Sequence, residues 1–289
     1  MPSRLACVAL LLYWLAAAIG LAYRDLLPEL SVGSPPDLRT ISRAGGDDLP
    51  ARWNLVIVDK LNDPTSWRSV GQALTKSRRD EKGWVEMSSR VVFDSGRLFP
   101  SLLREAAASR RVEEQIEFVS IYQVDPSGNL RSFEAEVKLA NDPASLWRID
   151  GKLDGKTHAM EIVSKGPLPL LNRTMSFDYQ ARGVVQSQFG PLDRLPGLHV
   201  GQRWDERTVN PLTGQVETVR AEVKRKQVIH WDKSPVTTLE VVHQSKGVTA
   251  RTWVRADGLV LRQEVVLPMI RLMLERQPDP VAAPEPAPK

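Results

Sequence analysis

Apolar and polar residues alternate along much of the segment 201–268. For example, Val219 and Ala221 share one parity, whereas Arg220 and Glu222 share the other. Such alternation places the two sets on opposite faces of a β-strand. The pattern extends over four segments separated by short turns: 216–231, 236–243, 248–255 and 259–267. Because strands joined by short turns pair antiparallel, it predicts an antiparallel sheet with one solvated face.

The preceding part of the chain contains a similar series of strand patterns. Six segments belong to it: 52–61, 84–93, 113–124, 130–139, 146–153 and 156–163. Asp125–Asn129 and Asp154-Gly155 have the composition of hairpin turns, so we expect these strands to form a second meander. A further strand is expected over 176–189.

Two short helices are predicted to cover the sheet. The first begins at Asp63-Pro64, runs through Trp67, Val70 and Leu74, and ends in a charged loop over 76–82. The second covers 99–111, which contains an alanine run and ends in two arginines, where the helix dipole favours cations. Two shorter stretches are interpreted as a crossing segment and a helical turn: 166–173 and 192–198.

The N-terminal segment from Leu5 to Tyr23 is almost entirely apolar. As a helix with a rise of about 1.5 Å per residue, it nearly matches the roughly 30 Å hydrocarbon core of a bilayer. Arg4 precedes it, so the positive-inside rule places the bulk of the chain outside the cytoplasm. A cleaved signal peptide, giving a secreted protein, is the alternative. We favour an uncleaved anchor because the apolar run is long and no clear cleavage site follows it.

These features divide the chain into four parts. A signal anchor, or transmembrane helix, is predicted over 1–28, and a linker rich in proline and glycine over 29–50. The β-rich extracytoplasmic domain spans 51–276, with a possible division into halves 51–165 and 170–276. The last part, 277–289, contains five prolines and is predicted to be an extended, disordered tail.

Composition and motifs exclude several kinds of chemistry. The net charge of +4 comes from 39 basic and 35 acidic residues, without the clustered basic excess of a nucleic-acid-binding protein. The single cysteine, Cys7, lies in the apolar N-terminal segment, so the folded part has no disulfide, catalytic thiolate or cysteine zinc site. The histidines lack His-x-x-x-His spacing, and Gly-x-Ser-x-Gly and phosphate-binding loops are absent. We therefore predict no enzyme, no catalytic residue, no metal and no cofactor.

Six of the eight tryptophans lie on or beside predicted strands: Trp53, Trp84, Trp147, Trp204, Trp231 and Trp253. Aromatic residues favour strands, so packing within the sheet is the simpler interpretation. The alternative is that some of them line a concave apolar pocket.

Four short runs carry a resemblance: Gly201–Trp204, Asn210–Thr213, Arg251–Val254 and Asp257–Arg262. They are similar to an uncharacterised bacterial envelope family shaped like the periplasmic lipoprotein carriers of the LolA and LppX type, over residues 160–268. The resemblance implies a mainly β fold, with a large antiparallel curved sheet or open half-barrel and one or two short covering helices. In such carriers the concave face holds acyl chains. The resemblance assigns six residues to that face: Trp204, Val223, Leu239, Val241, Trp253 and Leu261.

Three functions are considered, of which the third, an envelope hydrolase, is the least favoured because the sequence shows no catalytic motif. The first is a membrane-anchored module on the periplasmic side of the cell envelope that binds a lipid or another hydrophobic ligand without catalysis. The second is a structural or interaction subunit of an envelope complex, with a filled core, that contacts a protein partner through its sheet edge or Pro-rich tail. An open apolar cavity distinguishes the first from the second.

Overall fold

A computed structural model describes most of the domain predicted over 51–276. The described residues are 50–58, 66–94, 115–140, 145–166, 172–179, 185–187, 191–209, 216–245, 248–266 and 270–278, together with 13–15, 17 and 20. The N-terminal residues among them are helical, but no helix within the described residues is long and apolar enough to cross a bilayer. The rest of the predicted anchor, the linker before Pro50, the predicted helix over 99–111 and the tail after Pro278 lie outside the described residues.

Two series of strands make up the described fold. The first contains β1 (Ala51–Val58), β2 (Trp67–Arg79), β3 (Val85–Asp94), β4 (Gln115–Val124), β5 (Leu130–Leu139), β6 (Ser145–Leu153), β7 (Ala159–Lys165) and β8 (Arg173–Asp178). The second contains β9 (Val185–Ser187), β10 (Arg203–Val209), β11 (Val216–Trp231), β12 (Ser234–Ser245), β13 (Val248–Arg255), β14 (Val260–Val266) and β15 (Arg271–Arg276).

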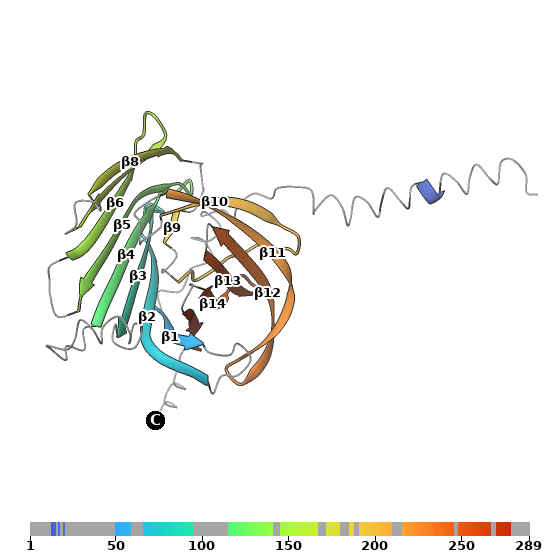
Figure 1. Ribbon diagram of the computed structural model, residues 1–289. Helices are drawn as coiled ribbons and strands as arrows, with labels where there is room; N and C mark the ends of the chain where they lie inside the picture. The colour runs from blue at the N-terminus through green and yellow to red at the C-terminus, as the bar shows by residue number, and fades with distance from the viewer. Residues whose placement is uncertain are drawn as a thin grey trace, which may run out of the picture.

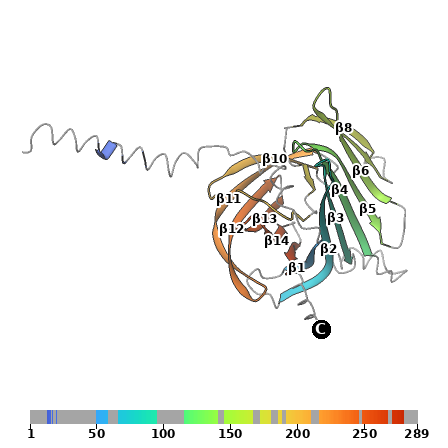
Figure 2. The ribbon, with the colours of Figure 1, turned by 180° about the vertical axis from the view of Figure 1, so that it is seen from behind.

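All fifteen strands belong to one sheet with the order β8-β7-β6-β5-β4-β3-β2-β1-β15-β14-β13-β12-β11-β10-β9. Strands β1–β8 form one meander and β10–β15 form another, and the antiparallel pair β1–β15 joins them, with Trp53 opposite Arg276. The pairs are antiparallel except for β9, which runs parallel to β10. Figure 1 shows β3–β8 on one side of the molecule and β10–β14 curving round the other, and Figure 2 shows the same arrangement from behind. The predicted mainly β fold with a large antiparallel sheet is confirmed, and the sheet is unclosed, with β8 and β9 at its ends.

One face of the sheet carries a hydrophobic core that runs through both meanders. In β1, for example, Ala51, Trp53 and Leu55 are buried on this face, whereas Arg52 between them is exposed. Other members come from strands on both sides of β1: Val91, Phe118, Ala135, Ile149, Ile162, Trp204, Val223, Val241, Val254 and Val260. Burial of this apolar surface is the main force that stabilises the sheet.

The opposite face is also covered near β1, β14 and β15. Two small clusters lie on it: Val56, Val58 and Met273 with Trp67 packed against them, and Ile229, Trp253, Leu259 and Leu261. The tip of the β11–β12 hairpin reaches this region, because Trp231 donates a hydrogen bond from Nε1 to the Arg276 carbonyl at 2.7 Å. The expectation of one solvated face is therefore wrong here.

The predicted helix through Trp67, Val70 and Leu74 is wrong, because this stretch forms strand β2. Leu55 pairs with Gly71 and Val56 with Ser69, which leaves Val70 as an extra, bulged residue. A bulge changes the parity of the side chains along a strand. Consequently Trp67 and Ala73 pack on opposite faces of the sheet, although their even spacing of six would place them on one face of a regular strand.

The connections between the meanders also differ from the prediction. The segment 166–173 is not a crossing segment: β7 and β8 form a hairpin, which Gly166 N closes by donating to Asn172 Oδ1 at 2.9 Å. The strand expected over 176–189 is divided between β8 and β9. The segment 192–198 is not helical, and Leu195 N donates to the Gly258 carbonyl at 2.7 Å. Prolines at 191 and 196 disfavour a helix here, because proline lacks the backbone donor.

The turn between β13 and β14 depends on Asp257 and Gly258. The Asp257 carboxylate accepts hydrogen bonds from Arg255 Nη2 at 2.7 Å and from Leu259 N at 3.1 Å. The bond from Arg255 outweighs the effect of burial and, with the bond from Leu259, lowers the pKa of Asp257 to about 2. Gly258 has a φ of +85°, and a Cβ atom there would lie 2.7 Å from Pro196 Cα.

We expect Gly258→Ala to lower the free energy of unfolding by about 1–2 kcal/mol, the cost of a left-handed conformation for a residue with a side chain. The contact with the Pro196 backbone adds to this cost, since backbone cannot rotate away. Urea denaturation measures the change. Gly155→Ala, in the β6–β7 turn, is the matched control, because no atom lies within 4 Å of the added Cβ. Equal losses in the two variants would contradict the prediction.

Candidate functional site

Four of the six residues predicted to line a ligand site belong to the main core. Trp204 is 1% exposed, Val223 and Val241 are fully buried, and Leu239 packs against them from a partly buried position. Trp204 lies opposite Ala221 on the neighbouring strand, and the small alanine leaves room for the indole. The four side chains share one face of the sheet and one core.

The structure places Trp253 and Leu261 apart from the other four. Both belong to the small cluster on the opposite face, where Trp253 donates from Nε1 to Gln227 Oε1 at 3.2 Å. The register shifts where Trp253 pairs with Arg262 and Val254 with Val260, which leaves Leu261 bulged. The expected single concave face of six residues therefore does not form.

These residues are tightly enclosed. Trp204, Val223, Val241, Trp253 and Leu261 are each at most 2% exposed. A side chain that lines a cavity large enough for water keeps accessible surface, whereas these keep almost none. Such packing is typical of a protein interior. The five residues lie in filled cores and not on an open ligand cavity.

Two further tryptophans have partners inside the main core. Trp53 donates from Nε1 to Thr75 Oγ1 at 3.1 Å, and Trp147 donates to Ser164 Oγ at 2.8 Å. A buried indole N–H requires an acceptor, and strand hydroxyls supply it here. These contacts favour packing as the role of Trp53 and Trp147.

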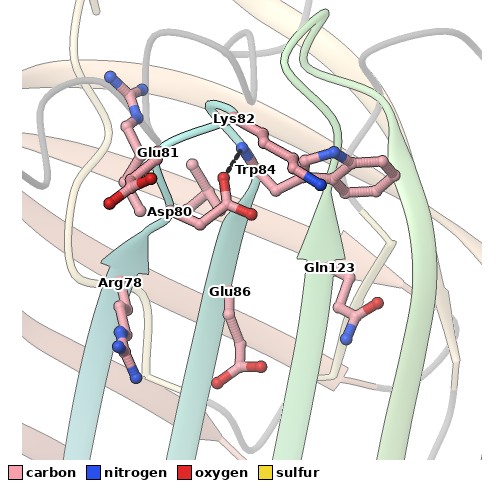
Figure 3. Close-up of a pocket in the computed structure, with 9 residues that line it drawn as sticks. Arg78, Asp80, Glu81, Lys82, Trp84, Glu86 and Gln123 are labelled. Carbon is pink, nitrogen blue, oxygen red and sulfur yellow. Dashed lines mark hydrogen bonds between the residues drawn. The ribbon is translucent and has the colours of Figure 1, made fainter.

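A surface pocket of about 680 Å³ lies where β2 turns into β3. Its lining combines charged side chains with one tryptophan: Arg78, Arg79, Asp80, Glu81, Lys82, Trp84, Val85, Glu86 and Gln123. Figure 3 shows Arg78, Glu86 and Gln123 side by side on neighbouring strands, next to the turn that carries Lys82 and Trp84. Trp84 is 39% exposed. This pocket is the candidate functional site.

The local sequence fixes the turn that forms the pocket. Asp80 Oδ1 accepts a hydrogen bond from Trp84 N at 2.8 Å, and Asp80 N donates to the Trp84 carbonyl at 2.9 Å. Gly83 allows the chain to turn, because its φ of +82° is unfavourable for other residues. The turn therefore holds the Trp84 backbone firmly while its side chain stays exposed.

The charged side chains around the pocket are available to a ligand. Within the part of the chain that the structure describes, five exposed residues form no ion pair or hydrogen bond through their side chains: Arg78, Arg79, Glu81, Lys82 and Glu86. Elsewhere on the sheet, some cross-strand charges are paired, as in Arg90–Glu117 at 2.6 Å and Arg225–Glu240 at 2.8 Å, whereas Lys152 and Glu161 lie opposite each other without an ion pair. Arg78 and Glu86 also lie opposite each other, yet they form no such pair. With Asp80, the lining carries three basic and three acidic groups.

This combination suits recognition of a polypeptide. Tryptophan and arginine are enriched among the residues that contribute most to protein–protein binding. Charged side chains of both signs that lack ion-pair partners can discriminate between binding partners by charge complementarity. Among the described residues, no group of three His, Cys, Asp or Glu side chains could hold a metal ion.

The sequence pattern predicts only a charged loop over 76–82. The useful signal is Trp84 itself, which follows a glycine directly after a run of mixed charges.

No protein-family model matches the chain, and no curated protein sequence matches it. Among solved structures, it is similar to a β-barrel-like protein of a domain of unknown function, DUF1849, from Brucella abortus. That match has 10% identity and a TM-score of 0.48, and covers 79% of this chain and 94% of the other. A DUF1089 family protein from Pseudomonas aeruginosa matches with 14% identity and a TM-score of 0.33, over 65% of this chain and 87% of the other. We transfer no function from either, and the resemblance to lipoprotein carriers stays a prediction.

Proposed function

We propose that this protein is a non-catalytic interaction module of the cell envelope, which binds another polypeptide through the pocket at the β2–β3 turn. The observation that carries the proposal is the pocket itself, in which the exposed Trp84 lies among six charged side chains of both signs, five of them without an ion pair or hydrogen bond to any described residue. Binding to a polypeptide would bury the indole and give these charges partners.

The filled interior supports the same choice. A lipid carrier needs an apolar space for an acyl chain, and five of the six residues assigned to such a space are at most 2% exposed. Lipid binding therefore rests on the resemblance alone, whereas the interaction module agrees with the packing of the described residues.

The proposed location rests on the N-terminal sequence. The apolar run from Leu5 to Tyr23, with Arg4 before it, favours a membrane anchor with the β-rich domain on the periplasmic side. An anchored module that binds a protein would hold its partner at the membrane surface.

In-cell photo-crosslinking tests the proposal. We would place p-benzoylphenylalanine at position 84 of the full-length protein and, as a control, at position 228, because Val228 is also exposed, at 58%, but lies on β11. We expect a discrete protein adduct from position 84 and none from position 228. When Arg78→Glu and Lys82→Glu are added, the yield of the adduct from position 84 should fall at least fivefold.

Native mass spectrometry with lipid extraction supplies the opposing test. Stoichiometric lipid on the purified protein, together with no adduct specific to position 84, would overturn the interaction module and support a carrier. Protein free of lipid, together with an adduct that depends on the basic residues, is the expected result.

A further inference from the structure

The chain leaves the sheet at the end of β15 in a defined direction. Gln277 N donates to the Arg52 carbonyl at 2.8 Å, and Gln277 Nε2 donates to Asn54 Oδ1 at 2.6 Å. These bonds continue the β1–β15 pairing by one residue beyond Arg276. The position and direction of the chain are thus known up to the point where the Pro-rich segment begins.

That direction leads toward the end of the sheet that holds the pocket. β15 and β2 are both antiparallel to β1, so they run in the same direction. Gln277 is bonded to Arg52, which pairs with Leu74 of β2. Arg79, at the edge of the pocket, lies five residues farther along β2 than Leu74. At about 3.3 Å per residue, Arg79 lies about 16 Å farther along the strand direction than Gln277. The two strand spacings from β15 to β2 add about 10 Å across the sheet.

The remaining chain is long enough to span this distance. Residues 279–289 comprise eleven residues with prolines at 280, 284, 286 and 288. A Pro-rich segment in polyproline II conformation extends about 3.1 Å per residue, or about 34 Å in total. The segment can therefore reach and cross the pocket without moving any strand.

The chemistry of the segment matches the pocket. Pro-rich segments in polyproline II conformation bind exposed aromatic side chains with a small loss of entropy, because their conformation is already restricted. Trp84 is the exposed tryptophan of the described sheet. The pocket carries three basic and three acidic groups, and the segment carries charges of both signs: Asp279 and Glu285 can meet Arg78, Arg79 and Lys82, and Lys289 can meet the acidic side chains.

We propose that residues 279–289 occupy the pocket at the β2–β3 turn in the same chain and compete there with the partner. The proposal uses the pocket of the proposed function and adds a means of regulating it. The tail covers Trp84 when no partner is present, and a partner has to displace the tail.

Disulfide trapping in the full-length protein tests the contact. In a Cys7→Ser background, Lys82→Cys is combined with Pro286→Cys. The control combines Val228→Cys with Pro286→Cys. Trp231, three residues from Val228, bonds the Arg276 carbonyl, so an undirected tail meets Val228 at least as readily as the pocket. We expect at least fivefold more intramolecular disulfide at position 82 than at 228, and a fall to the control level when Trp84→Ala is added.

Three outcomes would overturn the inference. Equal trapping at 82 and 228 would show an undirected tail, and trapping unaffected by Trp84→Ala would show that the indole is not the contact. A disulfide-linked dimer whose yield rises with protein concentration would identify a second copy as the occupant. The unfolding midpoint in urea confirms that each variant is folded.

The photo-crosslinking experiment separates this inference from the proposed function. If the tail competes with the partner, deletion of residues 279–289 should raise the adduct yield from position 84 at least twofold. If the adduct yield is unchanged by the deletion, the partner site stands and the competing tail is refuted. If position 84 gives no adduct in any variant but the intramolecular disulfide at position 82 forms strongly, the partner site is refuted and the tail contact stands.

Discussion

Trp204→Ala is expected to lower the free energy of unfolding by about 3–5 kcal/mol, the usual cost of removing a large aromatic side chain from a core. Trp204 is 1% exposed, and its ring contacts His243 edge to face, with ring centroids 6.3 Å apart. Its neighbour Ala221 is fully buried and too small to fill the space that is left. Urea denaturation followed by circular dichroism measures the loss.

Trp84→Ala is the matched control for this prediction. Trp84 is 39% exposed at the pocket, so its removal should change the stability by no more than about 0.5 kcal/mol. The pair of variants separates structure from recognition: loss of Trp204 should destabilise the fold, and loss of Trp84 should reduce only binding. If Trp204→Ala kept full stability but released a bound lipid, the filled-core interpretation would be refuted.

The meanders could be predicted because their strands have a simple period of two. The strands before and after the Asp257-Gly258 turn, and the hairpin around Asp125–Asn129, are found where the alternation and turn residues place them. Strand β15 could not be found in this way. It follows Pro268, and both Leu272 and Met273 are buried because both faces of β15 are covered. A strand buried on both faces has no alternation to detect.

The misplacement of Leu261 in the predicted site has a different origin. Bulges at Val70 and Leu261 shift the parity of side chains by one position, so residues with matching parity in the sequence point to opposite faces. Trp253 needs no bulge, because it neighbours Val254 of the main core and simple alternation places it on the opposite face. Local sequence does not reveal a bulge, because it depends on the register of two strands. The pocket was missed for another reason. It is formed by charges that lack partners, and pairing is visible only when the neighbouring strands are in place.

The face opposite the main core carries a row of alternating charges across five adjacent strands, from β11 to β15. Its members are Arg225, Glu240, Arg251, Glu264 and Arg271. The side chain of Glu264 is completely buried, and its oxygens lie 3.0 Å from Arg251 Nη1 and 3.1 Å from Arg271 Nε. Because each carboxylate lies between two guanidinium groups, the row fixes the relative positions of strands that also form part of the core.

Glu264→Ala should therefore lower the free energy of unfolding by about 2 kcal/mol, since it removes the buried carboxylate that Arg251 and Arg271 share, while both arginines remain about one-third exposed to water and Arg251 keeps Glu240. The matched control is Asp205→Ala. Its pair with Arg220, at 3.5 Å, is exposed on both sides, and such pairs contribute at most about 1 kcal/mol. Urea denaturation of both variants measures the difference. Equal losses would show that the buried row stabilises the sheet no more than an exposed pair does, and the main core alone would then have to hold β13–β15 in register.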